Sequence, residues 1–125
     1  MSKYHLAVNQ APKTDGRFFR ITKENFPALR NLAVQDLDMS PGEVREPHLH
    51  PNATQMDYCL SGSGQVGIIG PEGKAEVIEL TEGDAAYIPQ GYVHWIKNNS
   101  SETARFILIV SNEMPETIEL PQIQC

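Results

Sequence analysis

The stretch GDAAYIPQGYVHWIKN, residues 83–98, carries the pattern that decides the fold. Two short apolar segments, residues 85–88 and 93–97, flank a turn that contains Pro89 and Gly91. Proline fixes φ and glycine tolerates positive φ, so this pair favours a reversal of the chain. The stretch therefore predicts two short β-strands, with His94 delivered near the start of the second.

Segments of the same kind recur on both sides of this stretch, at residues 32–39, 55–60, 65–69, 75–80 and 105–110. Runs rich in Gly, Pro, Asn and Ser separate them, and no long helical pattern lies between. This spacing predicts an all-β antiparallel sandwich or barrel.

The first 29 residues differ from this pattern. Residues 17–21 predict an edge strand, and residues 22–27 predict one helical turn that Pro27 ends. The expected organisation is an N-terminal arm (1–29), a barrel (30–120) and a short C-terminal tail (121–125).

Composition limits the partners of the chain. Its 125 residues suffice for one domain, and ten basic residues are scattered among sixteen acidic ones, for a net charge of −6. This balance disfavours binding to nucleic acid or to an anionic membrane. Cys59 and Cys125 form no disulfide or zinc-site pattern, and no apolar run resembles a signal peptide or a membrane span. A cytoplasmic protein is expected.

Histidines indicate a candidate metal site. They occur in residues 83–98 and in a second stretch, residues 42–62, which reads GEVREPHLHPNATQMDYCLSG. Residues two apart on a strand share a face, so His48 and His50 can aim at one point. Gln55 opens the next strand and can add an oxygen, and Asp57 would share its face. Together with His94, these donors suit Mn, Fe, Co, Ni or Zn. His5 has no such partner in the sequence and is expected to be a surface residue.

These two stretches resemble the motifs of the cupins. The first stretch reads Gly-x5-His-x-His-x4-Gln-x6-Gly over residues 42–62, which is similar to the first cupin motif. The second reads Gly-x5-Pro-x-Gly-x2-His-x3-Asn over residues 83–98 and matches the second motif. Within that family the chain resembles germins and one half of the bicupin oxalate decarboxylases. The resemblance implies a double-stranded β-helix, or jelly-roll barrel, that holds one divalent metal, with manganese as the first expectation. The implied ligands are His48, His50, Gln55 and His94.

The resemblance also implies a substrate-binding arginine. In the oxalate-cleaving relatives an arginine at the position of Arg45 holds the substrate carboxylate, which a guanidinium does through two parallel hydrogen bonds. The alternative is an ion pair with Glu43 or Glu46 at the rim.

The chain departs from the family pattern in three ways. Gln55 replaces the usual glutamate, which removes a negative charge and predicts weaker metal binding. Residues 111–117 are shorter than the acidic lid of the decarboxylases, so Glu113 or Glu116 is either the acid of the reaction or a solvated surface carboxylate. Only one cupin domain is present, so a two-site arrangement would need an oligomer.

The function expected on this basis is that of a metal-dependent enzyme acting on a small carboxylate, in the manner of oxalate decarboxylase. The alternatives are a non-catalytic cupin that binds or senses a metal or small ligand, and an isomerase of uronates or sugars. The apolar side chains of residues 17–32 predict a homodimer, unless the arm folds back on its own barrel.

Overall fold

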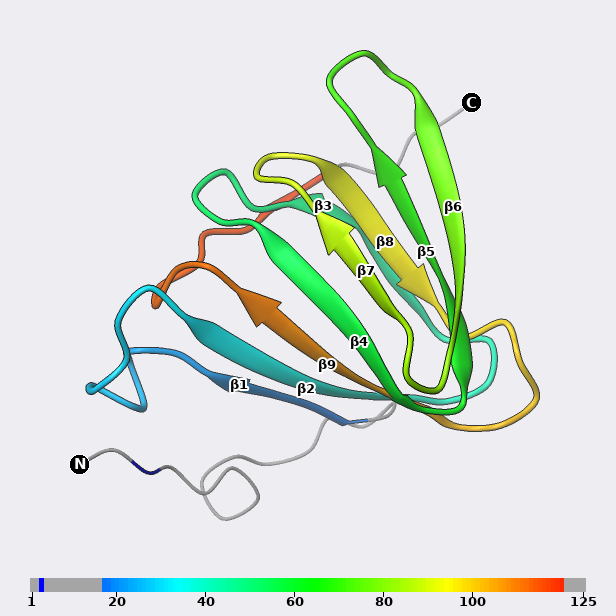
Figure 1. The fold of residues 1–125 in the computed structure, drawn as a ribbon, viewed down its shortest axis with the longest axis horizontal. Helices are drawn as coiled ribbons and strands as arrows, with labels where there is room; N and C mark the ends of the chain where they lie inside the picture. Colours follow the sequence, from blue (N-terminus) through cyan, green and yellow to red (C-terminus); the bar gives the residue numbers. More distant parts are fainter. Residues whose placement is uncertain (1–2, 4–16, 121–125) are drawn as a thin grey trace.

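The computed structural model describes residue 3 and residues 17–120, and this part of the chain consists of β-strands and loops (Figure 1). No helix there is long and apolar enough to cross a membrane. The strands within these residues are β1 (Arg17–Ile21), β2 (Ala33–Met39), β3 (Val44–Leu49), β4 (Gln55–Ser61), β5 (Ser63–Ile69), β6 (Ala75–Thr81), β7 (Ala85–Ile88), β8 (Val93–Lys97), β9 (Ala104–Val110) and β10 (Ile118–Glu119).

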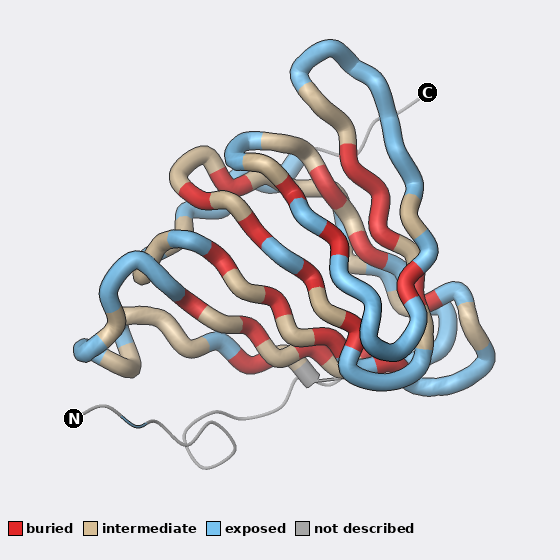
Figure 2. Tube along the Cα trace, in the orientation of Figure 1, coloured by how far each residue is buried: buried red, intermediate tan, exposed pale blue. Residues whose placement is uncertain are grey.

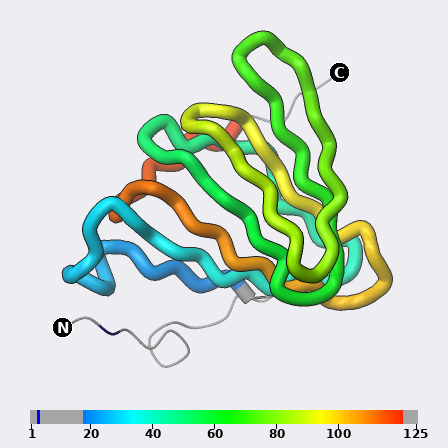
Figure 3. The backbone as a smooth tube through the Cα atoms, viewed as in Figure 1, coloured from blue at the N-terminus to red at the C-terminus, as the bar shows by residue number. Residues whose placement is uncertain are grey.

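The strands form two antiparallel sheets. The first has the order β1-β2-β9-β4-β7 and the second the order β10-β3-β8-β5-β6. Chain neighbours such as β3 and β4 lie in different sheets, so the chain repeatedly crosses from one sheet to the other (Figure 3). This topology confirms the all-β jelly-roll barrel predicted from the sequence.

Alternation along the strands builds the core between the sheets. In β2 every second residue is buried, and the same pattern continues on β9 (Figure 2). Strands of both sheets contribute to one cluster of buried side chains, which includes Leu37, Val66, Ile88, Ile96 and Phe106. The opposed sheets are therefore held together by apolar burial over the interior of the barrel.

One glycine is required by close packing. Gly67 on β5 pairs directly with Trp95 on β8, and a Cβ atom at position 67 would overlap the indole ring. The indole therefore covers the space that any larger side chain at position 67 would occupy.

Two strands are not among the predicted apolar segments, although the spacing of His48 and His50 was interpreted with strand geometry. The segment Val44–Leu49 is too polar to appear as an apolar run, and Ile118–Glu119 is only two residues long. Both strands belong to the second sheet, and both line the candidate site described below.

The part of the predicted arm that the structure describes lies against the barrel. β1 pairs with β2 over its whole length, and Phe19 is buried, so residues 17–21 form the edge of the first sheet. After β1, residues 22–27 form a turn closed by the bond from Phe26 N–H to the Thr22 carbonyl, at 2.8 Å. His5, Cys125 and the tail 121–125 lie outside the described residues.

Candidate metal centre

Three histidines converge at one end of the barrel interior. His48 on β3 lies opposite His94 on β8 in the strand register, and their ring centroids are 4.3 Å apart. His50 follows the end of β3. One ligating nitrogen from each ring lies within 4.8 Å of the others, which makes a group suited to one metal ion.

The turn predicted at residues 89–91 connects the two histidine-bearing stretches. Gly91 adopts a φ of 79°, and its N–H donates to the carbonyl of His50 at 3.0 Å. This bond fixes the start of β8 beside the end of β3. His94 and His50 are thereby brought together although 43 residues separate them in the sequence.

Main-chain carbonyls orient all three imidazoles. In each ring Nδ1 donates to a carbonyl oxygen, which leaves Nε2 as the atom with a free lone pair. The pairs are His48 with Glu46 at 2.8 Å, His50 with Glu116 at 2.8 Å and His94 with Tyr92 at 3.1 Å.

Gln55 completes the donor set, and Asp57 orients it as the shared face on β4 predicts. The Gln55 amide donates from Nε2 to Asp57 Oδ1 at 2.6 Å, which leaves Oε1 without a partner. Of the buried side-chain atoms without hydrogen bonds in the described part of the chain, three are His50 Nε2, His94 Nε2 and Gln55 Oε1. Buried acceptors without partners are costly, and a bound cation would satisfy all three. These residues therefore fit the divalent metal that the sequence predicts.

Burial sets the protonation of the site. It lowers the pKa of all three imidazoles, and in His94, where the neighbouring His48 adds to the effect, the pKa falls to about 3. Neutral imidazoles are the form that binds a metal. Burial also raises the pKa of Asp57 to about 7, while its hydrogen bond from Gln55 opposes that shift.

A cleft of about 450 Å³ opens beside the cluster, and His48 and His50 form part of its wall. Arg45 lines the same cleft. It is three residues from His48, a spacing that would place the two side chains on opposite faces of a regular strand. A β-bulge between them shifts the register, and both residues line the cleft.

Arg45 packs on an aromatic ring instead of forming the rim ion pair. Its guanidinium lies 3.9 Å from the centroid of Phe18, and within the described residues it makes no salt bridge to Glu43 or Glu46. Burial and then the charge of Arg20 lower its pKa. The structure thus places the Arg45 guanidinium in the cleft that His48 and His50 also line.

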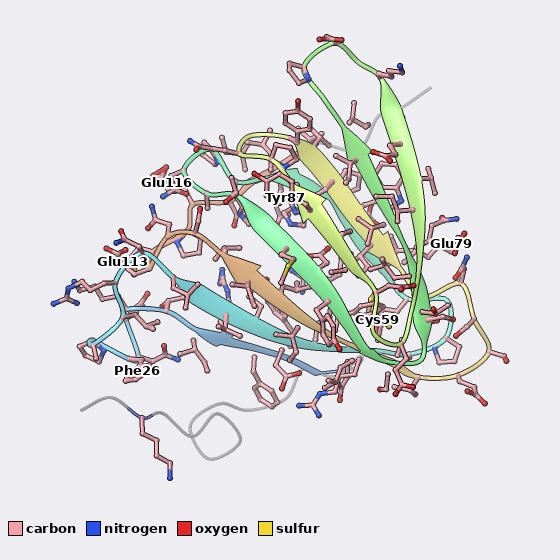
Figure 4. All side chains as sticks on the ribbon, viewed as in Figure 1. Phe26, Cys59, Glu79, Tyr87, Glu113 and Glu116 are labelled. Carbon is pink, nitrogen blue, oxygen red and sulfur yellow. The ribbon has the colours of Figure 1, made fainter. Side chains whose placement is uncertain are left out.

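The two carboxylates suggested as the acid are engaged elsewhere. Glu113, labelled in Figure 4, accepts a hydrogen bond from Asn31 N–H at 2.7 Å, and hydrogen bonds from its own main chain and from Asn31 lower its pKa. Glu116 acts through its main chain, because its carbonyl orients His50 while its side chain is exposed. Neither residue lines the cleft, so the structure favours the alternative of surface carboxylates.

The cleft contains polar residues that the sequence analysis did not identify, among them Glu119, Arg20 and Gln35. Glu119 on β10 lies opposite His48 in the register and faces the interior with it. Arg20 and Gln35 come from β1 and β2 in the other sheet. In the sequence, Arg20 and Gln35 are marked only as polar residues at inward-facing positions of otherwise apolar strands. Which positions face inward is known only when the strand register is known.

Comparison with known proteins establishes the family. The Cupin family profile matches residues 7–123, and the chain belongs to the cupins. It is 33% identical over 100 residues to the rhicadhesin receptor of Pisum sativum, covering 78% of this chain and 46% of that protein. It is 34% identical over 99 residues to germin-like protein 5-1 of Oryza sativa subsp. japonica, covering 78% and 45%.

Solved structures of oxalate decarboxylase have the same fold. A structure addressing its substrate binding mode matches with a TM-score of 0.86 and 26% identity, over 94% of this chain and 31% of that one. A structure of the Bacillus subtilis enzyme, from work on its Mn(II) centres, matches with a TM-score of 0.84 and 25% identity, over 90% and 30%. The chain thus spans about half the length of the curated relatives and about a third of the decarboxylase.

Proposed function

We propose that this cupin binds one divalent transition metal, manganese first, and decarboxylates a small carboxylic acid of the oxalate type. One observation carries the metal site: ligand nitrogens of His48, His50 and His94 lie within 4.8 Å of one another, and two of these imidazoles and the amide oxygen of Gln55 have buried acceptor atoms without partners. The likeness to germin-like proteins and to a decarboxylase with Mn(II) centres supports manganese and the reaction class.

The ligands in this proposal are His48, His50, His94 and Gln55. When bound, the metal supplies a Lewis acid that polarises a carboxylate oxygen. The four ligands are all neutral, so the charge of the ion is not reduced by the protein, and an anionic substrate is attracted to it.

Arg45 binds the substrate carboxylate from the side of the cleft. A guanidinium offers two parallel N–H groups that match the two carboxylate oxygens. Stacking on Phe18 fixes the plane of this group, so little side-chain freedom is lost when the anion binds.

Glu119 is the proposed proton donor, because it lines the cleft opposite His48 whereas Glu113 and Glu116 do not. In the reaction the bond between the two carbon atoms breaks and carbon dioxide leaves. Glu119 takes the acidic proton of the oxalate monoanion and returns it to the remaining carbon, so the monoanion yields formate and carbon dioxide with no external oxidant.

The test combines metal analysis with turnover. Protein loaded with Mn, Fe, Co, Ni or Zn is assayed with oxalate for release of formate and carbon dioxide. We expect turnover with manganese, and we expect Glu119→Gln to keep the metal and oxalate binding while losing product formation. Glu113→Gln is the matched control and should retain activity. Absence of metal binding to the folded protein would reject the proposal.

A second candidate is a non-catalytic cupin that binds a metal and a small acid. The position of residues 111–117 favours it, because hydrogen bonds hold this segment to the loop before β4 and its carboxylates stay outside the cleft. Metal-dependent binding of oxalate without turnover by any metal form would select this candidate.

A further inference from the structure

The wall of the cleft facing β3 and β10 carries two polar residues with no role in the proposed reaction. Arg20 on β1 and Gln35 on β2 are directly paired in the strand register, so their side chains leave the same face of the sheet. That face is the interior one, since Leu37, two residues after Gln35, is a core residue. Both side chains line the cleft with His48 and His50.

Gln35 is placed as a ligand-binding amide would be. It is only 5% exposed, and no hydrogen bond to its side chain occurs within residues 17–120. Its amide atoms are not among the buried atoms that lack a hydrogen bond, and the residue lines the cleft, so the amide is accessible from the cleft. An amide at the wall of a cleft can donate to and accept from a bound ligand.

Phe18 links Arg20 to the anion site at Arg45. The Arg20 guanidinium lies 5.7 Å and the Arg45 guanidinium 3.9 Å from the centroid of this ring. One aromatic side chain therefore holds two cations along the same cleft. Two like charges placed so close together are stabilised by an anion that contacts both.

The acidic residues of the cleft lie on one of its two walls. Glu43, Glu46 and Glu119 all come from β3, β10 or the loop before β3, which belong to the second sheet. Arg20 and Gln35 belong to the first. On the second-sheet wall the attraction for an anion is therefore confined to Arg45 and the histidines, and the first-sheet wall offers the other positive charge, Arg20.

We propose that Arg20 and Gln35 bind the distal carboxylate of a dicarboxylic acid longer than oxalate, whose proximal carboxylate binds at Arg45 and the histidine cluster. This inference rests on the proposed function and extends it to the substrate class. A cleft of about 450 Å³ lies in the range of sites that enclose molecules much larger than a two-carbon acid. The amide of Gln35 donates to one distal oxygen while Arg20 pairs with the charge.

The experiment compares acids that differ only at the distal end. Manganese-loaded protein, with its loading checked by elemental analysis, is titrated calorimetrically with succinate, with butyrate and with oxalate. Succinate should bind about tenfold more tightly than butyrate, which is the gain from one hydrogen bond to a charged group. Arg20→Gln should remove that difference and leave oxalate affinity unchanged.

Two further variants separate this role from a structural one. Arg30→Gln is the same substitution at an exposed arginine outside the cleft, and it should leave all three affinities unchanged. Gln35→Met keeps the approximate shape but removes the amide, so it should weaken succinate binding and leave butyrate binding unchanged.

The results also separate this inference from the proposed function. Equal affinities for succinate and butyrate, or an Arg20→Gln variant that behaves as Arg30→Gln does, would overturn the distal site. If oxalate binding stays metal-dependent in that case, the proposed function stands. Failure of every acid to bind the loaded protein would overturn both.

Discussion

The hydrogen bond between Gln55 and Asp57 changes the metal affinity that is expected for a Gln55→Glu variant. Considered by itself, Gln55→Glu restores an anionic ligand and should tighten metal binding. In the structure, however, the Gln55 amide donates to Asp57 Oδ1 at 2.6 Å, in a site where Asp57 is 1% exposed. Above the pKa of Asp57, about 7, the substitution would replace this donor with a second acceptor, and two buried carboxylates would face each other.

The magnitude follows from the lost hydrogen bond. Leaving a buried polar group unpaired costs about 1–3 kcal/mol, and more when it is charged. For a domain of this size, that loss lowers the melting temperature of the metal-free protein by about 3–10 °C. The repulsion also turns the new carboxylate away from its position, so we expect little or no gain in metal affinity from Gln55→Glu alone.

The double variant Gln55→Glu with Asp57→Asn reverses the polarity of the pair. The amide at position 57 then donates to the carboxylate at position 55, and the hydrogen bond is regained. We expect a melting temperature near that of the original protein and a metal affinity about tenfold higher, because an anionic ligand is added. Competition with a metal-sensitive dye measures the affinity, and calorimetry the stability. A single variant that gains as much affinity as the double variant would refute this reasoning.

Further outcomes are expected at other positions. His94→Ala should reduce metal affinity by about 100-fold or more, and full occupancy by elemental analysis would contradict the site. Asn52→Ala removes the bonds to Met114 O (3.1 Å) and from Glu116 N–H (2.8 Å) that hold the carbonyl orienting His50, so metal affinity should fall about tenfold with no ligand altered. Arg45→Lys should weaken oxalate binding about tenfold in calorimetry, because lysine lacks the planar fork, and unchanged affinity would place Arg45 outside the site. The homodimer stays a prediction: Leu32 is 41% exposed although Phe19 is buried within its own chain, and a monomeric mass in light scattering at high concentration would contradict it.

The site residues that could be predicted from the sequence are those whose relative positions depend on spacing over a few residues. His48 and His50 share a short segment, Pro89 and Gly91 position His94, and the alternation on β4 places Gln55 beside Asp57. Each of these relations spans a few residues, so strand and turn geometry suffice to predict it.

The residues that were missed depend on register between distant segments. Arg20 meets Gln35 through pairing of β1 with β2, and Glu119 meets His48 through a strand of two residues. The orientation of Arg45 depends on a β-bulge, which no periodicity reveals. Glu113 and Glu116 were suggested by their place after the last long strand, but hydrogen bonding of that segment takes their carboxylates away from the cleft.

The carbonyl groups that orient the three imidazoles have a consequence for how this site tolerates sequence change. A main-chain carbonyl is supplied by any amino acid, so replacing the side chain of Glu46, Tyr92 or Glu116 leaves the acceptor in place. The tautomer of each histidine therefore depends on where the backbone places a carbonyl group and not on the side chain of a particular neighbour. Mutations can accumulate around such a centre without altering the ligating nitrogens, provided that the barrel keeps its course.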